Sequence, residues 1–213
     1  DGDWRHPDDT RLVRDFVSLP TQPGRVSVSR GGVCWLLGGF GTGENMAYTD
    51  PRLRPLIDEW ARRNLAGDEP NVWIDPSPTF AALGATRDVR WWLHATKALR
   101  GALDGSDTTA RTVLADRLFV LEAYPYPRPT NPRRLLPTHR YTAHLLQEWI
   151  TSDRPIVIGR ARRDWTKLVP ELRTASFDGQ AMDVRNVQAA SISPGNLVGG
   201  ESAFATLARA ISG

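Results

Sequence analysis

The chain is poor in cysteine, lysine and long hydrophobic runs, and each shortage excludes a class of protein. Its single cysteine, Cys34, cannot form an intrachain disulfide, so we expect a buried, reduced thiol. No apolar stretch approaches the roughly 20 residues that span a bilayer, and no signal-peptide pattern is visible at the start. These observations predict a cytoplasmic protein with no membrane partner.

Signatures of three common enzyme classes are missing as well. The glycine-rich stretch 38–43 is not a P-loop, because no lysine follows Gly43, and its glycine spacing does not fit a dinucleotide site. No Gly-x-Ser-x-Gly motif supports a hydrolase triad. His94, His139 and His144 lack the spacing of a zinc site. We therefore expect no metal and no cofactor.

What the chain does contain is a set of short apolar segments separated by helical patterns. At 213 residues we expect one domain, 1–213. Strands alternating with helices imply parallel pairing. The predicted fold is therefore an α/β protein, a three-layer α/β/α sandwich around a short, mostly parallel sheet. The expected core strands are 33–37, 118–121, 155–158 and a fourth near 182–184 or 190–192, with a possible edge strand at 26–28.

Apolar stripes and capping residues predict the helices. We expect a long surface excursion at 67–87, which is rich in Pro, Gly, Asp and Thr, and an irregular loop at 125–137, which carries five prolines. The predicted helices cover 7–19, a segment ending near 64, 88–103, 107–115, 138–150, 162–172 and 201–211.

Polar loops follow these strands directly, and open parallel sheets bind ligands outside the carboxyl ends of their strands. The sequence therefore predicts one composite site. After the first strand, Glu44, Asn45 and Asp50 are candidates to orient a water as a general base. The alternative is that they are turn and helix-capping residues.

Aromatic and amide side chains in the other loops are candidates for contact with a flat ligand. Aromatic rings at a strand end can stack a nucleobase, but the tyrosines could equally seal the end of the core. Ser193 and Asn196 lie in a turn that is also an ordinary start of a helix. The full set of candidate substrate-binding residues is Phe40, Tyr124, Tyr126, Asn131, Ser193 and Asn196.

Positive charge is carried almost entirely by arginine, because Lys97 and Lys167 are the only lysines. Arginine offers planar, bidentate donors suited to phosphate, although GC-rich coding also raises arginine content. Clustering of the arginines favours an anion-binding face. The candidate phosphate-binding residues are Arg128, Arg133, Arg134, His139, Arg160 and Arg163.

Five short motifs between residues 91 and 196 together carry a family resemblance that covers roughly residues 33 to 211. They are Trp91-Trp92, Pro125-Tyr126, Leu136-Pro137-Thr138, Arg160 with Trp165, and Ile192–Asn196. In this order the chain resembles the uracil-DNA glycosylase superfamily, and more closely an uncharacterised bacterial group of that shape. The resemblance implies a base-binding cleft, DNA as the partner and hydrolysis of an N-glycosidic bond without a metal.

The resemblance also implies roles for individual residues. A flipped base would stack on Phe40 or Tyr126, Asn131 or Asn196 would read its edge, and Glu44 or Asn45 would hold the water. The family's proline and acidic residue are absent from Gly38–Gly41, and Ile192-Ser193-Pro194 replaces a His-Pro-Ser turn. Two alternatives therefore stay open. One is a non-catalytic module that binds nucleic acid or nucleotides, and the other is a hydrolase of free nucleosides.

Overall fold

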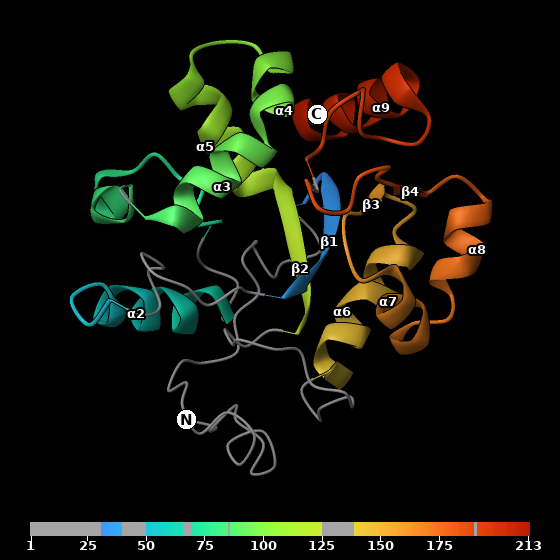
Figure 1. Cartoon of the computed structure of the whole chain (residues 1–213), viewed down its shortest axis with the longest axis horizontal. Coiled ribbons are helices and arrows are strands. Elements are labelled where there is room, and N and C mark those ends of the chain that lie inside the picture. Colours follow the sequence, from blue (N-terminus) through green and yellow to red (C-terminus); the bar gives the residue numbers. More distant parts are fainter. Residues whose placement is uncertain (1–30, 40–49, 66–69, 85, 125–138, 190) are drawn as a thin grey trace.

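A computed structural model describes residues 31–39, 50–65, 70–84, 86–124, 139–189 and 191–213. Their centre is a four-stranded, entirely parallel sheet with the order β2-β1-β3-β4 (Figure 1). The strands are β1 (Val33–Gly39), β2 (Leu118–Tyr124), β3 (Ile156–Ile158) and β4 (Ala181–Asp183). Helices cover both faces of this sheet, so the predicted α/β/α sandwich is confirmed.

Capping residues begin two of the helices. Thr86 and Ser106 cap α3 and α5 by accepting hydrogen bonds from Val89 N and Thr109 N. The helical segments are α2 (Arg54–Leu65), the 3-10 helix η2 (Pro78–Leu83), α3 (Arg87–Ala95), α4 (Lys97–Ala102), α5 (Asp107–Arg117), α6 (His139–Thr151), α7 (Arg162–Leu168), α8 (Leu172–Phe177) and α9 (Gly200–Ser212).

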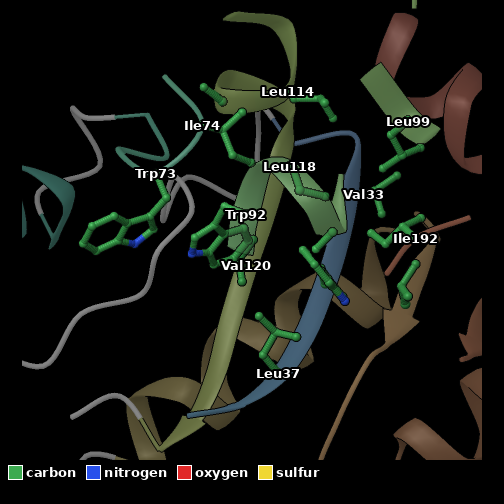
Figure 2. Packing of buried hydrophobic residues seen from close by; sticks show 14 of the residues in the cluster. Val33, Leu37, Trp73, Ile74, Trp92, Leu99, Leu114, Leu118, Val120 and Ile192 are labelled. Atoms are coloured by element: carbon green, nitrogen blue, oxygen red, sulfur yellow. The ribbon is translucent and has the colours of Figure 1, made fainter. Parts of the chain in front are cut away.

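Alternate residues of the strands supply two separate cores. On β1, Val33, Trp35 and Leu37 face one core, while Cys34 and Leu36 face the other. The first core contains buried residues of α2, α3, α4, α5 and α9, and Figure 2 shows part of it packed on one side of β1 and β2. The second core contains buried residues of α6, α7 and α8.

Two predicted segments differ from what the structure contains. Strand β2 runs on through Glu122 to Tyr124, and all seven of its residues are buried, whereas the sequence placed 122–124 in a loop. The segment 67–87 is not a surface excursion where it is described, because its residues 71–74 are buried in the first core. Asn71 N donates to Ala115 O and joins this segment to α5.

Two predicted helices are each divided. The helix expected at 88–103 is interrupted at Thr96, whose hydroxyl donates to Trp92 O, and α4 then continues the chain. The helix expected at 162–172 ends before Val169, which is extended at φ −132° and ψ 90° because Pro170 follows it. The fourth strand lies at 181–183, and the expected helix 7–19 and strand 26–28 lie outside the described residues.

Within the described ranges, no helix has both the length and the apolar character needed to cross a membrane. Within the same ranges, no cluster of three or more His, Cys, Asp or Glu side chains could hold a metal ion. Both cores pack against one sheet. The single domain over 1–213 remains a prediction.

Candidate functional site

The candidate site lies at the carboxyl end of the sheet, where parallel pairing brings the ends of all four strands to one edge. Gly39 lies opposite Tyr124 in the register of β1 and β2, and Ile158 lies opposite Asp183 in that of β3 and β4. In Figure 1 this edge is opposite the one that carries α4, α5 and α9. We call it the carboxyl rim, and ligands of parallel sheets bind at such rims.

Among the described residues, Arg160 makes several contacts at this rim. It follows β3 directly, and its backbone N–H donates to Leu36 O at 3.2 Å. Its guanidinium donates to Val187 O at 3.1 Å and to Gln188 O at 2.9 Å, and lies 5.4 Å from the ring centre of Trp91. Arg160 therefore joins the loop after β4 to helix α3.

Three tryptophans continue inward from this contact. Trp91 is partly exposed and stacks on Trp35 with ring centres 5.7 Å apart and an interplanar angle of 11°. Trp92 meets both rings edge-on. Trp35 is fully buried, and a Cβ at Gly159 would lie 2.4 Å from its Nε1. The Trp91-Trp92 pair thus contributes one ring to the core and one to the rim.

The loop at 185–189 is exposed but held by a dense set of hydrogen bonds. Asn196 is its main support: its Oδ1 accepts from Asn186 N at 2.8 Å, and its Nδ2 donates to Ser191 O at 2.8 Å. The Asn186 side chain in turn accepts from the backbone N–H groups of Gln188 and Ala189. These bonds fix the shape of the loop, so its exposed groups are preorganised.

The amide of Asn196 is therefore occupied by the protein itself. Its second N–H points to Asn186 O at 3.5 Å, and the residue is only 9% exposed. Its neighbour Ser193 is partly buried, and Ser193 O accepts from the backbone N–H groups of Asn196 and Leu197. Asn196 thus lies beside the residues that follow β4, and both residues hold the turn together.

Arginines lie beside the ends of β3 and β4. Arg162 pairs with Asp183 at the end of β4, and Arg185 Nη1 donates to Gly195 O at 3.2 Å. Arg163, the second residue of α7, is exposed. Among the candidate phosphate-binding residues that are described, Arg160 and Arg163 lie at this rim.

Tyr124 and His139 lie together at the end of β2. Their rings are 5.3 Å apart and nearly perpendicular, at 87°, and the exposed fractions are 7% for Tyr124 and 2% for His139. This packing agrees with the alternative in which a tyrosine seals the end of the core. A ring this deeply buried is not at the surface where a phosphate would be bound.

Asp50 has a role as a turn and capping residue. Its carboxylate accepts from Arg52 N at 2.9 Å and from Arg52 Nη2 at 2.9 Å, and its carbonyl accepts from Leu53 N and Arg54 N. The hydrogen bonds from Arg52 lower the pKa of this carboxyl group, which makes it a weaker proton acceptor.

The remaining candidate site residues lie outside the described residues. They are Phe40, Glu44, Asn45, Tyr126, Arg128, Asn131, Arg133 and Arg134.

The structure also contains a carboxylate that was not expected in the interior. Glu122 is only 3% exposed and lies opposite Leu37 in the register, two residues before the end of β1. A buried ion carries a desolvation penalty of several kcal/mol, so such groups concentrate at functional sites. In the sequence, Glu122 interrupts an apolar run with a charge, a pattern that also predicts the start of a loop.

One hollow of about 620 Å³ lies at the opposite edge of the sheet. Among its lining residues are Asp116 and Arg117 from the end of α5 and Ile211 from the end of α9. Gly32 N donates to Arg117 O, which places the hollow beside the amino ends of β1 and β2. It is therefore distinct from the carboxyl rim.

Comparison with known proteins gives no relative. No family model matches the sequence, no curated protein matches it, and no solved structure matches the fold. The resemblance to the uracil-DNA glycosylase superfamily therefore depends on the sequence motifs alone.

Proposed function

We propose that this protein is DNA glycosylase-like: it binds a flipped nucleobase at the carboxyl rim and hydrolyses the N-glycosidic bond of that base. The observation that carries the proposal is the convergence of Arg160, Trp91 and the 185–189 loop beside the ends of four parallel strands. This rim combines an aromatic ring, which can contact a base, with arginines, which suit phosphate.

The charge around the rim supports a nucleic-acid partner. Arg160, Arg163 and Arg185 all follow the carboxyl ends of β3 or β4, and the exposed Arg163 is positioned to meet a phosphate. Cations along one edge neutralise the phosphates of a nucleic-acid backbone, and the affinity of such binding falls as the salt concentration rises.

A non-catalytic binding module is the second candidate, and one observation favours it. The side chains of Asp50 and Asn196, both predicted to act on the ligand, are engaged within the protein by Arg52 and by Asn186 and Ser191. A protein that recognises a base without cleaving it needs only the shape and the charge of the rim.

Incubation with oligonucleotides separates these candidates. The panel contains uracil, hypoxanthine and modified bases, with free nucleosides as a second arm, and alkali reveals abasic sites as strand breaks. If the protein is a hydrolase, at least one oligonucleotide of the panel should show strand breaks after alkali. If it is a binding module, the oligonucleotides should bind in a salt-sensitive manner without strand breaks. Absence of both binding and breaks would refute the proposed function.

Two arginine variants test the location of the partner. Arg163→Ala removes an exposed cation from the rim, and Arg173→Ala removes an exposed cation from α8. If Arg163 contacts a phosphate, its loss should reduce the slope of log affinity against log salt by about one. Arg173→Ala should leave the slope unchanged, and equal effects of the two variants would contradict the location.

A further inference from the structure

Ala161, directly after Arg160, has a backbone conformation that L-residues rarely adopt. Its φ is 53° and its ψ is 31°, in the left-handed region, and among the described non-glycine residues only Asp153 also has a positive φ. A Cβ makes this conformation unfavourable, and residues strained in this way concentrate at functional sites, where the surrounding structure holds them. The strain at Ala161 therefore points to a role for the turn after β3.

Contacts on both sides hold this turn in its strained conformation. The backbone N–H of Arg160 donates to Leu36 O at 3.2 Å. On the other side, Ala161 O accepts from Trp165 N at 3.0 Å, and the buried indole of Trp165 donates to Leu37 O at 2.9 Å. The turn is thus fixed to the end of β1 at two points, so a relaxation of the backbone at Ala161 would disturb these bonds.

The turn directs the guanidinium of Arg160 across the rim. Arginine has five N–H donors in a fixed fork. Nε and one Nη2 donor bind the carbonyls of Val187 and Gln188, at 3.1 and 2.9 Å, so one side of the fork holds the 185–189 loop. The other side, Nη1 with the second Nη2 donor, makes no hydrogen bond within the described part of the chain. Because Arg160 is partly exposed, this second pair of donors suits a ligand that arrives from solvent.

We propose that Ala161 is a positioning residue. Its left-handed turn aims Arg160 so that one side of the guanidinium holds the 185–189 loop and the other binds a phosphate of the nucleic acid. This inference deepens the proposed function and rests on it. Guanidinium and phosphate match in bidentate geometry, and charge-assisted pairs of this kind are the strong ones. Because the loop and the Trp91 ring already hold the Arg160 side chain, it loses little rotamer freedom when a phosphate binds.

The test is fluorescence anisotropy at several salt concentrations, with the labelled oligonucleotide of the panel that the unaltered protein binds most tightly. Valine strains left-handed backbone more than alanine does, because it is branched at Cβ. Ala161→Val should therefore turn Arg160 away from the phosphate. The affinity should fall about tenfold, and the slope of log affinity against log salt should decrease by about one. Ala161→Gly, which adopts this backbone without strain, should keep both values.

Asp153 provides the matched control. Its φ is 56°, and it lies in the turn before β3, at the edge of the sheet opposite the carboxyl rim. Asp153→Val is compared with Asp153→Ala, so that both sites undergo the same change from alanine to valine, and this change should leave the affinity unaltered at Asp153. Hydrogen exchange is the second readout: exchange of the amides at 185–189 should be faster in Ala161→Val and unchanged in Asp153→Val.

The positioning role is overturned, and the proposed function stands, if Ala161→Val binds as tightly as the unaltered protein or loses affinity without faster exchange at 185–189. Equal losses of affinity at the two sites also overturn the role, because they would report general strain. Failure of the unaltered protein to bind any oligonucleotide of the panel overturns the proposed function together with this inference. Should Ala161→Val not fold, Arg160→Lys, which keeps the charge and loses the fork, decides: its affinity should fall, and an equal affinity overturns the inference.

Discussion

Gly159→Ala should destabilise the protein by disturbing the tryptophan stack behind the rim. A Cβ at this position would lie 2.4 Å from Trp35 Nε1, 3.1 Å from Leu37 Cδ2 and 3.2 Å from Leu36 O. Ordinary contacts begin near 3.4 Å, so the indole must move by about 1 Å. Trp35 is fully buried between the sheet and α3, which leaves it no free space to move into.

Overpacking of this kind costs about 1–3 kcal/mol. For a chain of this size, about 2 kcal/mol corresponds to a decrease in Tm of roughly 4–8 °C. The measurement is urea unfolding followed by tryptophan fluorescence, with near-ultraviolet circular dichroism to report on the ring stack. Both signals should change in Gly159→Ala, because the movement of Trp35 disturbs its contact with Trp91.

Gly101→Ala is the matched control. Gly101 lies within α4 and a Cβ there meets no atom within 4 Å, so alanine should raise the stability by about 0.5–1 kcal/mol through helix propensity. The reasoning would be refuted if Gly159→Ala unfolded at the urea concentration of the unaltered protein or above it.

Three further changes have defined outcomes. Asn196→Ala should lower the free energy of unfolding by about 1–3 kcal/mol, measured in urea, because it leaves Asn186 N without its acceptor; no loss would contradict the support given to the loop. Arg160→Lys should speed amide hydrogen exchange at 185–189, because an ammonium group cannot make both carbonyl bonds, and unchanged exchange would count against it. Burial raises the pKa of Cys34 above the ordinary value of 9.0. As the pH rises, the thiol of the unfolded chain therefore ionises before that of the folded protein. The free energy of unfolding should fall above about pH 9, by up to about 1.4 kcal/mol per pH unit. Denaturation at several pH values should give a shallower decline for Cys34→Ala, and an identical decline would refute the effect.

The succession of strands and helices along the chain could be predicted because buried parallel strands are continuous apolar runs. The boundaries of these elements were harder to predict. Glu122 interrupts such a run, and its burial depends on the register with β1, which local sequence does not specify. The burial of 71–74 likewise depends on contacts with α5. The break before Pro170 was readable, since the residue before a proline avoids helical backbone.

The location of the candidate site stays a prediction, and the contacts of its residues could not be predicted from the sequence. Parallel strands bring Tyr124 and Arg160 to one edge whatever their side chains do, whereas Asn196 reaches the residues after β4 through the bridge of Val184 with Leu197. Arg160 and Asn196 both bind the loop at 186–188. Their partners there are 10 to 28 residues away in the sequence, and only the fold brings them together. Roles inferred from residue type therefore require the structure as a test.

Hydrogen exchange in the presence of a DNA oligonucleotide tests the central claim most directly, because it locates the partner on the sheet. We predict protection of backbone amides at 159–163 and 185–189, which follow the carboxyl ends of β3 and β4. Protection instead at 112–117 and 211–213, beside the hollow at the amino ends of the strands, or no protection anywhere, would contradict the claim.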